Sequence, residues 1–441
     1  MEARQAATEI AQRLLRAGHQ AFFAGGCVRD FLLEKTPKDY DIATSARPEE
    51  VLAALPQAIA IGAHFGVMLV KHAGHAIEIA TFRTDGSYRD SRRPESVEFS
   101  SPENDALRRD FTINGLFQNP LSGEILDYVG GLDDLREKTL RAIGQPELRF
   151  HEDALRLMRA IRFSGKLNFH IEPKTWLAIR QSAPRLPQIS CERIRDEFSQ
   201  IITSPNRRRG IELLVESDLM AQFMPEFLTT IGCEQPPQWH PEGDVFIHTC
   251  IMLEMLDADA PLDLCLAVLL HDIGKPACRT VDETGRIRFN GHDALGADMA
   301  AEILTRLKYP NAVIASVTEM VARHMQFMNV QKMRTSRLKQ FMARPGFPEE
   351  MELHRVDCGS SNGLTDNYEF ILEKQLEFSA EPLIPPPLVN GGDLISLGLR
   401  PGPAFKTLLD SVQIEQLEGR ILERKTALDF LKQQVDLHSF P

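Results

Sequence analysis

The sequence predicts an α+β protein that is mostly helical, with a small mixed sheet confined to its N-terminal part. Up to about residue 145, short strand-like runs alternate with turns. Within this part, VMLVKHAGHAIEIATF (67–82) is typical of a hairpin with its turn near Gly74. From about residue 150 onward, apolar residues recur with helical spacing almost throughout. Strands first and helices afterwards favour a sheet-containing N-terminal domain followed by all-helical ones.

The first elements follow from hydrophobic periodicity and from glycine positions. A helical stripe near the N-terminus stops at Gly18, and AFFAGG (21–26) predicts a short strand that runs into a glycine turn. Asp39–Ile42 reads as a second strand. Stretches rich in proline and glycine at 236–245 and 381–392 divide the helical part. We therefore expect four domains, covering residues 1–145, 146–235, 236–380 and 381–441.

Composition bounds the class of protein. The 441 residues are 43% hydrophobic and 25% charged, as in ordinary globular proteins. The densest apolar run, LCLAVLL (264–270), is far shorter than the roughly 20 residues of a membrane helix, and the N-terminus lacks the apolar core of a signal peptide. Seven cysteines without a C-x-x-C pair favour a reducing cytoplasm. The net charge of −12 by itself disfavours a nucleic-acid partner, but it is compatible with a local basic groove.

The stretch FAGGCVRDFLLEKTPKDYDIA (23–43) closes on two aspartates, Asp39 and Asp41. Strand residues two apart point to the same side, so both carboxylates would lie on one sheet face, and Glu78 could add a third. Three carboxylates repel one another unless a cation binds them, and hard oxygen ligands suit Mg²⁺. Two such ions can activate an attacking hydroxyl and neutralise a leaving pyrophosphate.

The same stretch opens on two glycines. Gly25 and Gly26 would let backbone N–H groups approach a triphosphate, and Arg29 could clamp phosphate oxygens. The alternative is a tight turn and a solvated acidic strand end, which either half alone would favour. The combination is more specific than its halves. GGCVRD does not match the dinucleotide-binding fingerprint, and no Gly-Lys-Ser/Thr follows to make a P-loop.

These motifs are followed by RRDFTINGL (108–116), DYVGGLDDL (127–135) and HEDALRLMRAIRF (151–163). Their order and spacing resemble those of the bacterial class II tRNA nucleotidyltransferase/poly(A) polymerase family, which builds or repairs the CCA end of tRNA. The likeness covers roughly the first half of the chain. It implies a polymerase-β-like nucleotidyltransferase head and an all-α neck. It further implies that Asp39 and Asp41 hold Mg²⁺ beside Glu78, and that the nucleotide sugar and phosphates meet Arg109, Asp110 and Asn114.

Glu152, Asp153 and Arg156 are expected on one helix, with the last two three residues apart on one face. A carboxylate accepts from the amino group of cytosine or adenine while a guanidinium donates to the ring nitrogen. Uracil and guanine reverse both polarities and are rejected. The resemblance implies that these positions select CTP and ATP; an ordinary surface ion pair is the alternative.

Histidines recur across the helices of the third domain. Their order resembles the H…HD…D pattern of the HD phosphohydrolase superfamily, and neutral imidazoles with carboxylates suit a divalent transition metal. The expected ligands are His248, His271, Asp272 and Asp357, extended by His292 and His324 to a second ion. Such a domain could hydrolyse phosphoesters or scaffold the RNA, and the sequence leaves both open.

Two basic stretches are candidates for phosphate contacts with tRNA. The residues are Arg207, Arg208, Arg209, Arg400 and Lys406. The first three could equally form a solvated helix start. The polar segment 83–99 matches a family loop that helps the pocket switch from CTP to ATP.

Taken together, we expect a template-independent CTP/ATP:tRNA nucleotidyltransferase that adds the terminal CCA. The rivals are a CC-only or A-only tRNA enzyme, a poly(A) polymerase, an HD-type phosphohydrolase with a degenerate head, and a non-catalytic RNA-binding protein.

Overall fold

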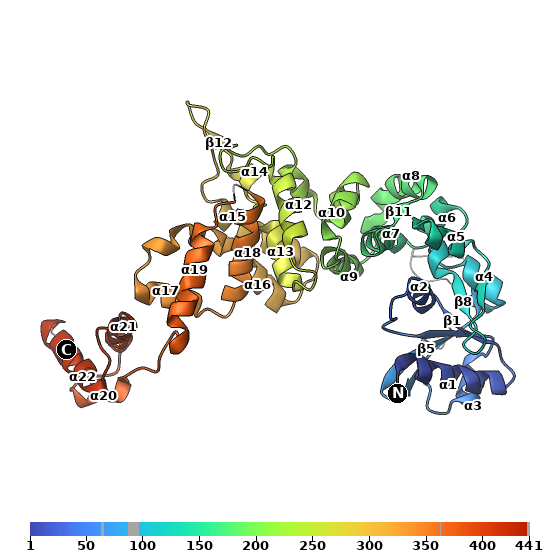
Figure 1. The fold of residues 1–441 in the computed structure, drawn as a ribbon, viewed down its shortest axis with the longest axis horizontal. Helices are drawn as coiled ribbons and strands as arrows, with labels where there is room; N and C mark the ends of the chain where they lie inside the picture. The colour runs from blue at the N-terminus through green and yellow to red at the C-terminus, as the bar shows by residue number, and fades with distance from the viewer. Residues whose placement is uncertain (63–65, 87–96, 362, 439–441) are drawn as a thin grey trace. The chain divides into compact units, whose positions relative to one another are not determined.

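The computed structural model describes residues 1–62, 66–86, 97–361 and 363–438. The chain forms two compact units. The first comprises Met1–Thr229 with Ile303–Tyr309, and the second Thr230–Glu302 with Pro310–Pro441. The sheet lies in the first unit, and the second is almost entirely helical, as the sequence predicts (Figure 1). The finer division into four domains stays a prediction.

A seven-stranded mixed sheet is the centre of the first unit, in the order β3-β4-β5-β2-β1-β8-β9. The pair β2 and β5 is parallel and the other pairs are antiparallel. The predicted hairpin is confirmed, with its turn at Gly74. The predicted strand at 39–42 begins only at Asp41. The strands are β1 Ala21–Ala24, β2 Asp41–Thr44, β3 Ile59–Gly62, β4 Val67–His72, β5 His75–Thr81, β8 Leu116–Gln118 and β9 Ile125–Asp127.

Helices position the glycine turn against this sheet. Helix α1 (Ala3–Arg16) buries Ile10 and Leu14 and packs across β1, β2, β4 and β5. Helix α2 (Gly26–Leu32) follows β1 directly and packs against β8 and the short η2 (Thr112–Asn114). The smaller elements of the head are α3 Pro48–Ala54, β6 Arg83–Asp85, β7 Val97–Phe99, α4 Pro102–Leu107, α5 Gly131–Arg136 and β10 Thr139–Leu140.

The neck is a helical bundle in the same unit. Its central helix, α7 (Leu155–Leu167), packs against α9 (Cys191–Ile202) and α10 (Arg207–Glu216). The sequence predicts one continuous helix from Glu152, and this is wrong. Asp153 is extended (φ −142°, ψ 104°) and its Oδ1 accepts from the Leu155 amide at 3.0 Å, which ends one helix and starts the next. The remaining elements are α6 Pro146–Glu152, β11 His170–Ile171, α8 Pro173–Ser182, η3 Ala183–Gln188, α11 Met220–Phe223 and η4 Pro225–Thr230.

In the second unit, helix α13 (Leu262–Leu270) is the most deeply buried element, as its sequence LDLCLAVLL requires. It packs against α12 (Val245–Met255), α16 (Asn311–Arg323) and α18 (Phe347–Ser360). Its C-terminus therefore ends among three neighbouring helices, where His271 and Asp272 follow. The other elements between α13 and residue 332 along the chain are α14 Lys275–Cys278, β12 Thr280–Val281, β13 Ile287–Arg288, α15 His292–Arg306 and η5 His324–Lys332.

The C-terminal part has apolar cores of its own. One gathers around Phe327 and Phe341, and a separate one around Leu394, Val412 and Leu431. The elements are α17 Thr335–Met342, α19 Asp366–Glu377, η6 Phe378–Ala380, α20 Gly391–Ser396, α21 Pro403–Leu417 and α22 Arg424–His438. Across the described part of the chain, no helix has the length and apolarity that a membrane crossing needs.

Candidate active site and metal centre

Two carboxylates lie side by side where strands β2 and β5 of the head sheet pair. Asp41 opens β2 and is the register partner of Glu78 on the parallel strand β5. Because neighbouring strands lie about 4.8 Å apart, the two side chains share a sheet face. The pKa of Asp41 is raised to about 6, first by desolvation against the protein, then by Glu78 and more weakly by Asp39, while Arg109 opposes the shift. The structure thus pairs Asp41 with Glu78, whereas Asp39 lies outside the strand, so the expectation that Asp39 and Asp41 share one strand face is corrected.

This arrangement fits a divalent cation. The donors are carboxylate oxygens, all on residues that keep access to solvent, and hard oxygen ligands are those that Mg²⁺ prefers. The pKa of Asp41 is raised first by desolvation and then by repulsion from Glu78 and Asp39. A bound cation would remove that repulsion.

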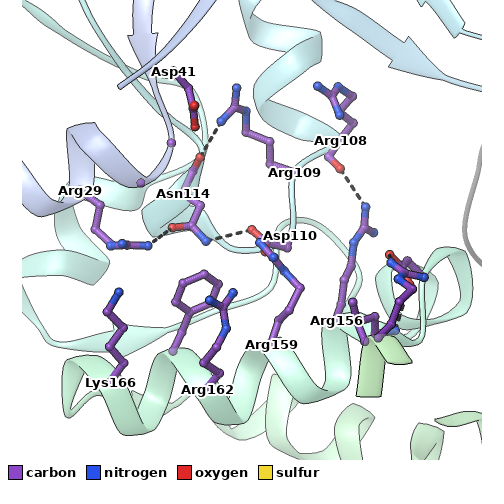
Figure 2. A pocket seen from close by; sticks show the side chains of 16 residues that line it. Arg29, Asp41, Arg108, Arg109, Asp110, Asn114, Arg156, Arg159, Arg162 and Lys166 are labelled. Carbon is purple, nitrogen blue, oxygen red and sulfur yellow. Dashed lines mark hydrogen bonds and ion pairs between the residues drawn. The ribbon is translucent and has the colours of Figure 1, made fainter. Parts of the chain in front are cut away.

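A cavity of about 540 Å³ opens beside Asp41, between the head and the neck helix α7 (Figure 2). Its volume suits a nucleotide-sized ligand. Its charge is opposite to that of the whole chain, because eight basic side chains line it against three acidic ones. The basic residues are Arg29, Arg108, Arg109, Arg156, Arg159, Arg162, Lys166 and Arg193, and the acidic ones are Asp41, Asp110 and Asp153. The cavity is the local basic groove that the composition left open.

Gly25 and Gly26 line this cavity with bare backbone. Gly25 has φ +72°, and a Cβ there would lie 2.9 Å from Nη1 of Arg109. The glycine is therefore required by its backbone conformation and by the close approach of Arg109. Arg109 in turn donates to the Asn114 carbonyl at 3.2 Å and to Asp105 at 3.0 Å. The double glycine thus makes room for an arginine as well as for a ligand.

A hydrogen-bonded chain links the head to the neck across the cavity floor (Figure 2). Arg29 donates to Oδ1 of Asn114 at 2.7 Å, Asn114 donates to Oδ1 of Asp110 at 3.0 Å, and Arg159 donates to Oδ2 of Asp110 at 2.5 Å. Burial opposes ionisation of Asp110, but the Arg159 charge and these hydrogen bonds hold its pKa well below the usual range. Asp110 and Asn114, expected to contact the nucleotide, have their polar groups engaged with protein and hold Arg29 and Arg159 in place.

Asp153 and Arg156 line the cavity, but they are not paired with each other. Asp153 forms an ion pair with Arg193 at 3.0 Å. Arg156 forms one with Glu152 at 2.6 Å and donates to the Arg108 carbonyl at 3.1 Å. The expected single helix for Glu152, Asp153 and Arg156, with the last two on one face, is corrected by the break at Asp153. Glu152 is not among the cavity-lining residues, and its carboxylate holds Arg156 instead.

Sequence reasoning did not assign five basic residues of this cavity, Arg108, Arg159, Arg162, Lys166 and Arg193, and three of them lie on α7. Together with Arg156, these three stand three or four residues apart, so they share one helix face. The repeated spacing of basic residues in RLMRAIRFSGK was the signal that could have found them. Arg193, which reaches the cavity from α9, carried no such signal.

The six expected HD residues converge in the second unit. The ligand atoms of His248, His271 and Asp357 lie within 4.8 Å of one another, and so do those of Asp272, His292 and His324. Nε2 of His292 and Nε2 of His324 are 3.1 Å apart. The Nε2 atoms of His248 and His271 lie 3.1 Å from carboxylate oxygens of Asp357 and Asp272, respectively, in a cluster whose histidines are buried. Buried imidazole nitrogens and carboxylate oxygens that converge in this way fit a metal centre.

Each of the four histidines is held through Nδ1. His271, His292 and His324 place Nδ1 2.6–2.8 Å from the carbonyl of the residue three positions earlier. A carbonyl only accepts, so Nδ1 carries the proton and Nε2 keeps its lone pair for an ion. Burial, with the charges of His271 and His292, lowers the pKa of His324 to about 4, which keeps it a neutral ligand.

His248 is held differently, because its Nδ1 lies 2.7 Å from Oε1 of Glu242. Burial lowers the pKa of His248, but Asp357 and Glu242 outweigh it and raise the pKa to about 9. The same Glu242 oxygen is 2.9 Å from Nδ1 of His240, and Lys275 forms a 2.6 Å ion pair with Asp272. The sequence analysis missed Glu242, His240 and Lys275. Their only signal in the sequence was position. His240 and Glu242 lie in the HPEGD stretch before α12, and Lys275 follows the His-Asp pair by three residues.

The expected tRNA contacts are dispersed. Arg207 is 1% exposed and its Nε donates to the Ser204 carbonyl at 3.2 Å, so its prediction as a phosphate contact is wrong. It starts α10 with its side chain inside the neck. Arg208 pairs with Glu212 and Arg209 with Glu216, both at the surface of the neck. Arg400 and Lys406 are exposed in the C-terminal part. Most of the predicted switching loop, residues 87–96, lies outside the described residues.

Three family models match the chain. The poly(A) polymerase head domain matches residues 21–141, the probable RNA and SrmB-binding site of polymerase A residues 168–230, and the HD domain residues 245–355. A nucleotidyltransferase head together with an HD domain implies dependence on a divalent metal.

Curated relatives named CCA-adding enzyme match at two ranges of coverage. The one from Geobacillus stearothermophilus is 46% identical over 218 residues, so this alignment spans about half of each protein, 49% of this chain and 54% of the relative. The one from Streptococcus mutans serotype c is 32% identical over 445 residues, covering 98% of both chains.

Solved structures agree with these relatives. A Bacillus stearothermophilus CCA-adding enzyme in complex with CTP is 28% identical and has a TM-score of 0.77, over 100% of this chain and 99% of the other. A Thermotoga maritima CCA-adding enzyme complexed with tRNA, at 18% identity, has a TM-score of 0.63 over 98% and 95% and shares the fold. With a full-length relative above 30% identity and a head, an RNA-binding segment and an HD domain in the same order, the chain belongs to the CCA-adding enzyme family.

Proposed function

We propose that the chain is a template-independent nucleotidyltransferase that adds or repairs the 3′-terminal CCA of tRNA, with CTP and ATP as substrates. The observation that carries the proposal is the single basic cavity that joins Asp41 at one end to Asp153 and Arg156 at the other. The phosphates of an NTP are anionic, and its base presents a fixed pattern of hydrogen-bond donors and acceptors. This cavity offers basic side chains to the phosphates and Asp153 and Arg156 to the base.

In the proposed reaction, the RNA 3′-hydroxyl attacks the α-phosphate, and the bond from the α-phosphorus to the bridging oxygen of pyrophosphate breaks. Asp39, Asp41 and Glu78 would hold Mg²⁺, which when bound activates the hydroxyl and neutralises charge on the leaving group. The guanidinium groups of Arg29 and Arg109 are held by side-chain and backbone acceptors, so they are oriented before the nucleotide arrives. The reaction is then largely one of positioning.

At the base end, Asp153 would accept from the exocyclic amino group of cytosine or adenine, and Arg156 would donate to the ring nitrogen. Their present partners support this role. Arg193 pairs with Asp153 and Glu152 pairs with Arg156, so each of the two side chains is positioned by another group and they do not neutralise each other. Uracil and guanine would face each of them with the wrong polarity.

We further propose that tRNA phosphates contact Arg208 and Arg209 on the neck and Arg400 and Lys406 on the C-terminal part. The first two arginines are held by acids in the free protein, so RNA would have to compete with Glu212 and Glu216.

All seven cysteines are free thiols, which supports the expected reducing cytoplasm.

Extension of defined tRNA tests the proposal. Transcripts ending before, within and after CCA are incubated with CTP and ATP, separately and together, and resolved on sequencing gels. Addition of C, C and A followed by arrest is the expected result. C-only or A-only products would identify a partial enzyme, and long A tails on unrelated RNA a poly(A) polymerase. No extension of any transcript would contradict the proposed activity.

A second function is favoured by the HD centre, whose imidazoles are fixed with their Nε2 atoms facing one another. We propose that these residues bind a divalent transition metal and support hydrolysis of a phosphoester. Metal content after loading with Mn²⁺, Ni²⁺, Co²⁺ or Zn²⁺, followed by hydrolysis of bis(p-nitrophenyl) phosphate, tests it. Metal bound at this centre without hydrolysis would leave it as a scaffold for the RNA.

A further inference from the structure

One aromatic ring in the cavity stands beside three arginines. The guanidinium carbon of Arg162 lies 4.4 Å from the centre of the Phe163 ring, that of Arg29 5.1 Å and that of Arg159 5.3 Å. Arg29 comes from α2 of the head, whereas the other two share α7 with Phe163. Phe163 itself is only 5% exposed, yet it lines the cavity. The ring is therefore the common neighbour of guanidinium groups from two parts of the unit.

Each of these arginines is held by an acid on another side. Arg29 pairs with Asp30 at 2.7 Å, Arg159 with Asp110 at 2.5 Å, and Arg162 with Glu197 at 2.7 Å; the three acids sit on α2, beside η2 and on α9. A guanidinium has five N–H donors in a planar fork, and a carboxylate engages two at most on one edge. Arg29 also donates through Nη1 to Asn114 and Arg162 through Nη1 to Gln200, at 2.7 Å each, and each of the three forks still has N–H groups beyond these bonds for another anion. Figure 2 shows their side chains converging on the same space.

Placing three cationic guanidinium groups close together costs electrostatic energy, which other interactions must offset. The pKa of Arg162 is lowered, first by burial and further by the neighbouring charges of Arg159 and Arg29, although Glu197 and Asp110 act in the other direction. An aromatic face carries a negative quadrupole that attracts guanidinium groups within about 6 Å of its centre, most strongly where water is excluded. Phe111 packs edge-on against Phe163 at 5.8 Å and 78°, which fixes the plane of the ring.

We propose that Phe163 is a positioning residue for the triphosphate of the incoming nucleotide. Its ring holds the planes of Arg29, Arg159 and Arg162 so that their unpaired donors face one polyphosphate. The inference deepens the proposed nucleotidyltransferase function and rests on it. Leucine at this position would fill most of the same apolar volume but would lose the quadrupole, whereas tyrosine would keep the ring face.

The competing explanation is that Phe163 only fills the core between the head and the neck. Under that explanation leucine and methionine would lower thermal stability and leave polyphosphate binding unchanged in the folded fraction. Phe198 provides the matched control, because it is fully buried in the same neck and its aromatic neighbour is Phe223.

The experiment compares the full-length wild type with Phe163→Leu, Phe163→Met, Phe163→Tyr and Phe198→Leu. Binding of inorganic tripolyphosphate is measured by calorimetry, and KM for CTP and ATP by single-nucleotide extension of tRNA. For leucine and methionine we expect about 10- to 30-fold weaker tripolyphosphate binding and a matching rise in both KM values, with the preference for CTP over UTP unchanged. Tyrosine restores binding to within about threefold, and Phe198→Leu leaves it at the wild-type level.

Equal tripolyphosphate affinity of wild type and the folded leucine or methionine variant would overturn the inference, as would an equal loss in Phe198→Leu. If one variant fails to fold, the other carries the comparison. Failure of the wild type to extend any tRNA is a separate result. It would remove the proposed function, while the calorimetry would still report whether the ring governs polyphosphate binding.

Discussion

The nucleotide cavity and the HD centre differ in the charge of their functional groups and in what restrains those groups. In the cavity the functional groups are permanent charges, and each is restrained by a group of opposite sign, as Arg156 is by Glu152 and Asp153 by Arg193. In the HD centre the groups are mostly neutral imidazoles, and three of them are restrained by backbone carbonyls one helical turn earlier. The first arrangement suits an anionic substrate that arrives and leaves, and the second an ion that stays.

The difference also lies in what builds each site. The cavity depends on long side chains from α2, α7 and α9, so its geometry follows from a network of ion pairs. The HD centre depends on short side chains at helix ends, so its geometry follows from the backbone. Substitution of one acidic residue should therefore shift several side chains of the cavity, whereas in the HD centre its effect should stay local.

The largest expected effect separates the two sites. Asp41→Ala should lower the rate of nucleotide addition by at least about 1,000-fold, because the carboxylate that would hold the cation beside the α-phosphate is lost. Metal binding at the HD centre should not change. Gel-resolved tRNA extension and metal titration measure the two. Asp133→Ala, an exposed head aspartate paired with Arg136, is the control, and addition that survives in Asp41→Ala would refute the assigned cation site.

The next effect concerns the base rather than the phosphates. Asp153→Ala should reduce the preference for CTP over UTP by about 10- to 100-fold, since the acceptor for the cytosine amino group disappears. The ratio of kcat/KM for the two nucleotides in a single addition measures it. Asp196→Ala, an exposed neighbour on α9, should keep the wild-type ratio. A preserved ratio in Asp153→Ala would show that other groups read the base.

The sequence was sufficient for much of this. The mixed sheet, the hairpin and the six HD residues were all predictable, because hydrophobic patterning and motif order constrain them directly; the pairing of Asp41 with Glu78 depends on the parallel neighbours β2 and β5, which alternation within one strand does not give. The break at Asp153 was not, since an aspartate whose side chain caps the following helix looks the same in sequence as one inside a helix. Nor was the burial of Arg207, because three adjacent arginines give no sign of which one faces inward.

The supporting residues were the harder part. Asp110 and Asn114 could be assigned to the site from their motif, but not their role of holding Arg29 and Arg159, which depends on contacts 49 to 85 residues apart in sequence. Glu242 was equally invisible, because the loop before α12 shows no periodicity that would aim it at His248. Residues that act by positioning another residue give the weakest signal in the sequence.

A smaller effect is expected at Glu242, which holds His248 in the HD centre. Glu242→Gln should weaken binding of Zn²⁺ or Mn²⁺ by about tenfold, because an amide holds the His248 ring less firmly and makes it a poorer donor. Competition with a chromophoric chelator measures the affinity. Glu234→Gln, in the same loop but exposed and paired with Arg279, should bind like wild type. Nucleotide addition should be equal in both variants, and loss of addition in Glu242→Gln alone would contradict the independence of the two sites.

The smallest effect tests the network that the cavity depends on. The folded-state pKa of Asp110 lies below its ordinary value of about 4, so the stabilisation from its pairing with Arg159 is complete above that pH and is lost as the pH falls through the folded-state value. Asp110→Asn should therefore cost about 2 kcal/mol at pH 7 and lower the melting temperature of the first unit by about 4–8 °C.

Melting of wild type and Asp110→Asn, followed by circular dichroism from pH 7 down to pH 3, measures this difference. The gap between the two curves should narrow below about pH 4, because the Asp110 carboxyl of the unfolded wild-type chain then takes up a proton that the folded state still excludes, and asparagine has no such group. Asp218→Asn, an exposed neck aspartate paired with Arg180 at 3.4 Å, should melt within about 1 °C of wild type at every pH. A gap that stays constant with pH would mean that Asp110 acts through its hydrogen bonds to Phe111 and Asn114 rather than through its charge.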